Sequence, residues 1–182
     1  KGVNMALSTI GTNSIADDAI TAAKTSGVGI TMVDQFRLTS NLTADADPIT
    51  SNLERVDDAS FSQIGTGMTL SSGIYTFPTT GLFQVSVNAT FQISQDVNAD
   101  VETYVSSNSG GAYDQVAIAT GGEQSSSFSN FSSSSQCFVN VSNASTFRVK
   151  FVLSGVASTD TRLQGSTNAN STAFTFIRLG DT

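Results

Sequence analysis

The side chains in this sequence that could do chemistry are mainly carboxylates, and five of them fall within one short stretch. Loops with several carboxylates suit hard cations such as Ca²⁺, which takes about six to eight oxygen ligands. The spacing here does not follow a known ligand pattern such as that of an EF-hand loop. We therefore predict a solvated acidic rim, with a cation site as the alternative, and assign no metal ligand and no cofactor. The five residues are Asp45, Asp47, Glu54, Asp57 and Asp58.

Residue types that most catalytic sites require are missing. The sequence contains no histidine, and Cys137 is its one cysteine. Ser-His-Asp and Cys-His triads, His-based zinc sites and a disulfide within this chain are therefore excluded. Glu102 together with Glu54 or Glu123 could form the carboxylate pair of a glycosidase. Since these acids are expected on solvent-facing strands or loops, we predict that the protein is not an enzyme and assign no catalytic residue.

Two phenylalanines in a serine-rich run form a third candidate site. The run spans residues 125–135 and reads SSSFSNFSSSS. Its composition predicts an adaptable exposed loop, yet full solvation of Phe128 and Phe131 is unfavourable. We expect both rings to cap one end of the domain; the alternative is an exposed aromatic contact for a sugar or a host surface. Cys137, which follows the run, is predicted to be a small, inert core residue.

The charge of the chain bears on its partners. The formal net charge is −7, only 13% of residues are charged, and the 8 Lys and Arg residues are scattered along the chain. Sequence-independent binding to DNA or RNA needs clustered basic side chains. The sequence has no run of about 20 apolar residues and no signal-peptide pattern at its start. We therefore expect no nucleic acid partner and no membrane span. A standard secretion signal is not visible, although processing could have removed one.

The elements that must position these side chains are strands, and the clearest is a central hairpin. Between residues 83 and 93 the odd positions are apolar and the even positions are polar, which predicts a long strand with two chemically different faces. Before it, residues 74–77 are rich in β-branched and aromatic types, and residues 78–81, Pro-Thr-Thr-Gly, favour a tight turn. We expect the rest of the fold to be organised around this hairpin.

Shorter segments with the same alternation lie on both sides of the hairpin. Turns separate them at intervals of about ten residues, which is typical of a β-sandwich or jelly roll. Eight to ten short strands are predicted in this way, and the fold class is therefore an all-β jelly-roll sandwich. Besides the hairpin, the segments are residues 34–40, 101–106, 113–119, 137–142, 147–153 and 173–179.

Residues 1–33 have a different pattern from the rest of the chain. Ser14-Ile-Ala-Asp17 reads as a helix start of the capping-box kind, and the apolar positions after it predict a helix of about ten residues. So short a helix is marginal alone and needs a surface to pack on. It either docks on its own domain or serves as an attachment or stalk segment for a head domain of residues 34–182. The apolar residues of this segment are Leu7, Ile10, Ile15 and Ile20.

The hairpin carries a family resemblance. Residues 73–85, Gly-Ile-Tyr-x-Phe-Pro-x-x-Gly-Leu-Phe-x-Val, resemble the signature hairpin of the complement-head and tumour-necrosis-factor-like jelly rolls, and residues 173–179 resemble that family's last strand. The family's collagen repeat and a disulfide pair have no counterpart here. The whole chain also resembles small virion proteins of marine bacteriophages, which join a segment like SIADDAITAAK to such a head and end in FIRLGDT.

The second resemblance implies a structural protein on the outer surface of a virion. It would be a homotrimeric head fibre, decoration protein or tail-fibre knob, anchored to other virion proteins through residues 1–33 and in contact with a host surface glycan. In the family's last strand one side faces the core and the other faces the three-fold axis. This implies that Phe174 and Phe176 fill the core and that Ile177 and Leu179 form the trimer contact. The alternative is a secreted binding domain of the same fold that recognises glycans or protein ligands.

Overall fold

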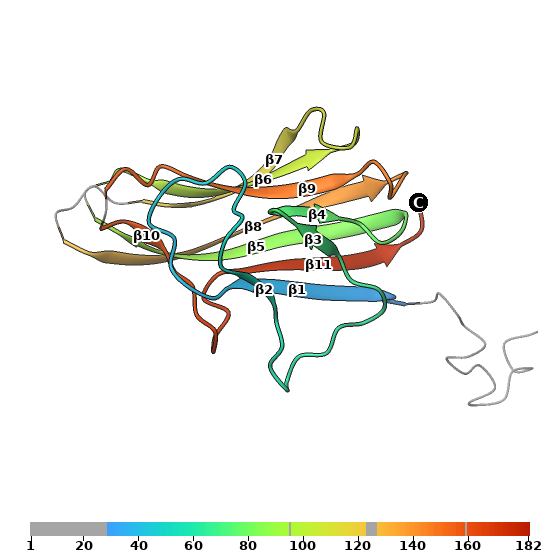
Figure 1. Ribbon diagram of the computed structural model, residues 1–182, viewed down its shortest axis with the longest axis horizontal. Coiled ribbons are helices and arrows are strands. Elements are labelled where there is room, and N and C mark those ends of the chain that lie inside the picture. The colour runs from blue at the N-terminus through green and yellow to red at the C-terminus, as the bar shows by residue number, and fades with distance from the viewer. Residues whose placement is uncertain (1–28, 95, 123–126, 159) are drawn as a thin grey trace, which may run out of the picture.

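A computed structural model describes residues 29–94, 96–122, 127–158 and 160–182, which form two packed antiparallel sheets (Figure 1). These residues contain no α-helix, and so none that is long and apolar enough to cross a membrane. The architecture is the all-β jelly roll that the alternation predicted. The strands are β1 (Met32–Leu38), β2 (Leu53–Arg55), β3 (Thr69–Ser71), β4 (Ile74–Thr76), β5 (Gly81–Ile93), β6 (Ala99–Ser106), β7 (Asp114–Gly121), β8 (Ser129–Val141), β9 (Arg148–Ser154), β10 (Arg162–Leu163) and β11 (Ala173–Gly180).

The two sheets meet in a layered sandwich. We call them sheet A, which has the order β10-β5-β11-β1-β2 with β8 also paired to β5, and sheet B, with the order β3-β4-β9-β6-β7. The long strand β5 is the centre of sheet A, because β8 pairs with its whole length and β11 pairs with residues 82–88. In Figure 1, β7, β6 and β9 of sheet B lie above β5, β11 and β1 of sheet A.

The core is filled from β5 and from a cluster of aromatic rings. The apolar odd positions of β5 are at most 1% exposed, which confirms the predicted face. Tyr75 is central to the ring cluster, with its centroid 5.1 Å from those of both Phe36 and Phe176. Phe151 stacks on Phe174 at 4.3 Å. Phe174 and Phe176 are fully buried, so the aromatic side of β11 faces the core as expected.

The predicted central hairpin is not formed. Its two segments are strands, but β4 pairs with β3 and β9 in sheet B and β5 lies in sheet A, so residues 77–80 connect the two sheets.

The serine-rich run is a second place where the sequence prediction of structure is wrong. Residues 129–135 were expected in an exposed loop, but they form the first half of β8. Serine has a weak strand preference, and this segment becomes a strand because it pairs residue by residue with β5, from Ile93↔Ser129 to Gly81↔Val141. Residues 162–163, which lie outside the predicted strands, also form the short strand β10.

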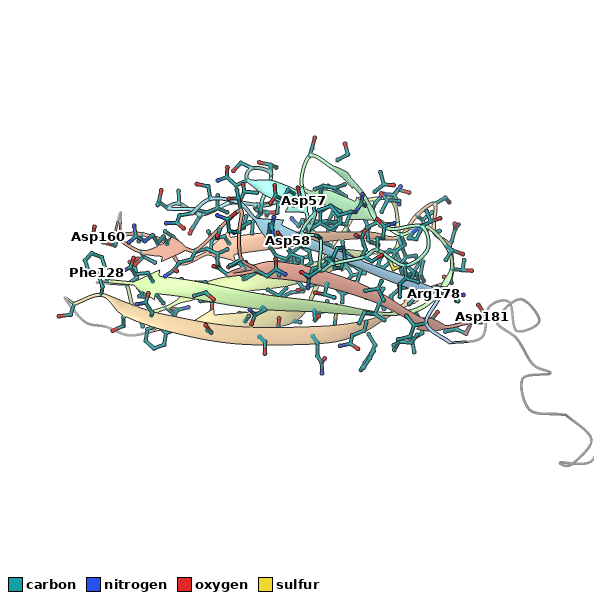
Figure 2. All side chains as sticks on the ribbon, turned by 90° about the horizontal axis from the view of Figure 1, so that it is seen from below. Asp57, Asp58, Phe128, Asp160, Arg178 and Asp181 are labelled. Atoms are coloured by element: carbon teal, nitrogen blue, oxygen red, sulfur yellow. The ribbon has the colours of Figure 1, made fainter. Side chains whose placement is uncertain are left out.

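The chain enters the domain beside its C-terminal residues. Arg178 donates from Nη1 to Thr31 Oγ1 (3.2 Å) and from Nε to the Thr80 carbonyl oxygen (2.9 Å), and it forms an ion pair with Asp181. Figure 2 shows Arg178 and Asp181 at one end of sheet A and Phe128 at the other. We call these the Arg178 end and the Phe128 end.

The predicted N-terminal segment is described only at its last residues. β1 begins at Met32, so Met32 and Val33, which the prediction placed in the segment 1–33, lie in sheet A. The predicted helix and its contact residues lie outside the described part of the chain. These residues are Leu7, Ile10, Ile15 and Ile20.

Candidate functional site

The outer face of sheet A, which points away from the core, carries no ionisable side chain on β5, β8 or β11. The alternation of each strand explains which residues reach this face, since neighbours in a strand point to opposite sides. The outward residues are Leu82, Gln84, Ser86, Asn88, Thr90 and Gln92 of β5, Asn130, Ser132, Ser134, Gln136, Phe138 and Asn140 of β8, and Ala173, Thr175 and Ile177 of β11. The β5–β11 register shifts between Arg178 and Gly180, so Gly180 lies opposite Leu82 and Leu179 is an exposed residue beside this pair.

At the Arg178 end this face is apolar. The strand register places Val33, Ile177 and Phe138 in one row across β1, β11, β5 and β8, with Gln84 between Ile177 and Phe138. Phe138 is 62% exposed and Leu179 is 40% exposed. We name this surface the apolar end; it consists of Val33, Leu82, Phe138, Ile177 and Leu179.

The apolar end contains both residues predicted for the trimer contact, Ile177 and Leu179, and three that the sequence analysis missed. The sequence pattern could have identified two of them. Leu82 and Phe138 are apolar residues at positions where the strand alternation predicts a polar one. Val33 joins them only through its pairing with Ile177, which lies far away in the sequence.

Next to the apolar end, toward the Phe128 end, the same face forms a depression of about 470 Å³. Its hydrogen-bonding groups are partly ordered by one another: Asn170 Nδ2 donates to Gln35 Oε1 (2.8 Å), and Gln35 Nε2 donates to Thr175 Oγ1 (2.8 Å). We name this depression the polar hollow. It is lined by Gln35, Ser86, Val87, Asn88, Ser134, Ser135, Gln136, Asn170, Ala173 and Thr175.

The outer face of sheet B is charged, and its charges are hydrogen-bonded. Glu102 accepts from Tyr104 Oη (2.7 Å), Gln115 Nε2 (2.7 Å) and Ser154 Oγ (2.5 Å). The hydrogen bond to this carboxylate raises the pKa of Tyr104 above its ordinary value. The pairing of Glu102 with Glu54, considered above for catalysis, is not formed, since Glu54 lies in β2 of the other sheet. The alternative partner, Glu123, lies outside the described residues.

A lysine on the same face lies between two tyrosines. Lys150 Nζ is 5.2 Å from the ring centroid of Tyr104 and 4.9 Å from that of Tyr113, and it forms an ion pair with Asp47. Each ring attracts the ammonium group through its negative face. These contacts tie the loop that carries Asp47 and the β6–β7 hairpin to the centre of sheet B.

Three of the five clustered carboxylates surround a buried guanidinium. Arg37, 1% exposed, donates from Nε to Glu54 (2.6 Å), from Nη1 to Asp58 (2.5 Å) and from Nη2 to Asp57 (2.9 Å). The bond to Glu54 is the main cause that raises the pKa of Arg37. Sequence analysis missed this residue. Its partner Glu54 faces it across the β1–β2 pairing, which no local pattern shows.

The other two carboxylates of the cluster have separate partners. Asp45 accepts from the Val156 amide (2.8 Å), and Asp47 pairs with Lys150. Among the described residues, no three Asp, Glu or Cys side chains lie together in a way that could hold a metal ion. The acidic cluster is thus divided between two cationic side chains and one backbone amide.

The two phenylalanines of the serine-rich run differ in their surroundings. Phe131 packs against the core, as the capping hypothesis expected, whereas Phe128 is 56% exposed at the far end of the sandwich. Cys137 also packs against the core from β8, and its partial burial raises the pKa of the thiol. Both observations on Cys137 agree with its predicted place in the core.

Comparison with known proteins establishes the fold. No protein-family model and no curated protein matches the sequence. Among solved structures, that of murine APRIL at pH 5.0 superposes with a TM-score of 0.60 at 11% identity, covering 81% of this chain and 98% of that one. The structure of Eiger TNF from S. frugiperda gives 0.61 at 11% identity, with 85% and 95% covered. At such low identity the likeness shows a shared fold, the tumour-necrosis-factor-like jelly roll.

Proposed function

We propose that this protein is a structural, non-enzymatic component of a bacteriophage virion, displayed on the particle surface as a homotrimeric head fibre, decoration protein or tail-fibre knob. The observation that carries the trimer is the apolar end of the outer face of sheet A. The sequence resemblance to phage virion proteins supports the location.

An exposed apolar group beside strands β5, β8 and β11, whose outward residues carry no charge, fits a contact between copies. The centres of protein interfaces are depleted of charged residues, and contiguous apolar surface on a monomer is unfavourable in water. Phe138 and Leu179 are exposed within the same group as Ile177. A three-fold ring in which each copy covers the apolar end of its neighbour would remove this group from solvent.

The positions of the chain ends suit a stalked head. The chain enters at the Arg178 end, so an attachment segment of residues 1–33 would leave the domain there and bind other virion proteins. Its contact residues would be Leu7, Ile10, Ile15 and Ile20. The Phe128 end would then point away from the particle, where three copies could make weak, multivalent contacts with a host surface.

Two measurements test this function. Light scattering of the full chain should give the mass of a trimer, and antibodies against the head domain should label the outside of purified virions of the source phage. A monomeric protein would overturn the trimer. A protein that is absent from virions and found free outside cells would instead support the alternative, a secreted binding domain of the same fold.

A further inference from the structure

We propose that the polar hollow is a binding site for a neutral oligosaccharide. The proposal rests on the proposed function in one respect: Ala173 and Thr175 of the lining share the side of β11 that would face the three-fold axis, so the three hollows of a trimer would face one another around that axis. The site itself is built within one copy of the chain, from β1, β5, β8, β11 and the loop that carries Asn170.

The charge of the lining selects a neutral ligand. All ten residues that line the hollow are uncharged, in a protein whose net charge is −7. A charged ligand would lose hydration here without gaining an ionic partner, and an anion would also be repelled by the protein as a whole. The outer face of sheet B shows that the chain does place charges on a solvent-facing sheet.

The hydrogen-bonding groups match hydroxyls. Side-chain amides supply donors and acceptors side by side, and serine and threonine hydroxyls do both. Only Val87 and Ala173 in the lining are apolar, so the hollow offers little to a lipid or an aromatic ligand. A sugar hydroxyl, which donates and accepts, can bond to such groups without leaving one of them unpaired.

Part of the site is organised before a ligand arrives. The chain of hydrogen bonds from Asn170 through Gln35 to Thr175 holds one wall of the hollow, while Asn88 and Ser134 stay exposed. Gln136 is positioned from the opposite side, because it accepts from Gln84 Nε2 (2.8 Å). Pre-ordered groups lose less entropy on binding than mobile ones.

The polar surface continues beyond the hollow as a track. Toward the Phe128 end the next β5–β8 pairs are Thr90 with Ser132 and Gln92 with Asn130, and Gln164 Nε2 adds a bond to Asn130 (2.9 Å). Successive outward pairs repeat about every 6.8 Å along the strands. Arg162 pairs with Gln92 and borders this path near the Phe128 end, while the β5 and β8 side chains that form the path are uncharged. An extended sugar chain fits such a linear path better than a compact metabolite does.

The apolar end and the hollow occupy successive rows of one face. Contact between copies through the apolar end therefore uses the half of the face at the Arg178 end. The hollow and its track lie in the other half, toward the Phe128 end.

The test is a titration of the full chain followed by NMR, with maltohexaose, laminarihexaose and chitohexaose as neutral probes and oligogalacturonate as the charged one. We expect at least one neutral probe to shift the side-chain amide signals of Asn88, Gln136 and Asn170, and the charged probe to leave them in place. Absence of shifts with all three neutral probes, or equal shifts with the charged probe, would overturn the proposal.

Variants locate the site. Asn88→Ala and Gln136→Ala should each weaken binding by about tenfold, the loss expected when one or two neutral hydrogen bonds disappear. Gln115→Ala is the matched control, because it removes the same amide group from the outer face of sheet B and should not change the affinity. Unchanged binding in both hollow variants would contradict the assignment.

Light scattering of the same samples separates the two proposals. A monomer that binds the sugar would refute the trimer and keep the site. A trimer that binds none of the neutral probes would refute the site and keep the trimer.

Discussion

The outer faces of the two sheets follow the same strand alternation but carry different chemistry. On sheet B, Glu102 and Lys150 are surrounded by groups of the same chain that neutralise or hydrogen-bond them. On sheet A, the strands β5, β8 and β11 present no charge, and Phe138 and Leu179 are exposed; on sheet B the exposed large apolar residues of the strands are Val116 and Ile118 of the edge strand β7.

This difference indicates which sheet face is suited to remain exposed to solvent. Ionisable groups that are partnered within the chain keep a sheet face soluble and leave little for another molecule to bind. The central strands of sheet A combine exposed apolar residues, an amide-lined depression and no charge, and such a surface is incomplete by itself. The comparison supports the proposal that sheet A contacts other molecules, and the following experiments test it in order of expected effect.

The largest effect should come from the inward side of β11. Phe176→Ala removes a fully buried ring that packs on Tyr75 and should lower the free energy of unfolding by about 3–5 kcal/mol. Since whole domains are stable by only about 5–15 kcal/mol, the melting temperature should fall on the order of 10 °C in calorimetry. Phe176→Leu, which refills part of the space, should cost less; equal stability of the wild type and Phe176→Ala would contradict the burial of this ring.

A substitution on the outward side of β11 should affect association of the copies and leave folding intact. Ile177→Asp would bury a carboxylate without a partner at the contact between copies, and we expect a folded monomer by light scattering and circular dichroism. The matched control is Ile74→Asp, on the outer face of sheet B directly opposite Lys150, which should remain trimeric. A trimer that survives Ile177→Asp would show that the apolar end is not the contact.

The ion cluster at the β1–β2 edge of sheet A should matter less. Arg37→Met leaves three neighbouring carboxylates without their shared cation, and we expect a loss of about 1–3 kcal/mol in urea unfolding. Arg37→Lys keeps the positive charge but loses the planar guanidinium group. Its stability should therefore lie between those of the wild type and Arg37→Met. The loss should shrink at high salt, which screens the repulsion among the carboxylates; a loss that does not depend on ionic strength would point to packing instead.

The smallest effect concerns the charged network of sheet B. Glu102→Gln removes the carboxylate that accepts from Tyr104 and should lower the pKa of Tyr104 toward its ordinary value, measured by ultraviolet titration. A raised pKa means that this bond contributes stability fully below the pKa of the unfolded state and loses it as the pH rises through the folded-state pKa. The wild type should therefore lose more stability than Glu102→Gln in strong alkali. Identical tyrosine titrations would rule out Glu102 as the cause.

Much of the fold could be predicted from local patterns. The alternation of residues 83–93 predicted β5 and its buried side, and the β-branched and aromatic residues 74–77 predicted β4. The hairpin expected between them was wrong, because local patterns give each strand but not its partner. The predicted aromatic side of the last strand is the buried side. These features depend on neighbouring residues, because the strand period sets the face of each side chain within the strand itself.

The candidate site could be predicted only in part. Ile177 and Leu179 were identified from one strand, but the hollow is assembled from segments up to 140 residues apart, as the bond between Gln35 and Thr175 shows. The strand β8 was missed over its serine-rich half because its pairing with β5, and not the preference of its own residues, makes it a strand. Arg37 likewise gains its three partners from a different strand and the loop after it.

The sequence by itself determined the fold class, the inward and outward residues of the regular strands, and the absence of histidine chemistry. The tertiary structure decided which outward residues become neighbours. Leu82, Phe138 and Ile177 are single apolar residues on three separate strands, and they form one surface only because β8 and β11 pair with opposite edges of β5 in this register. A shift of one residue in either pairing would turn every side chain of that strand to the other face.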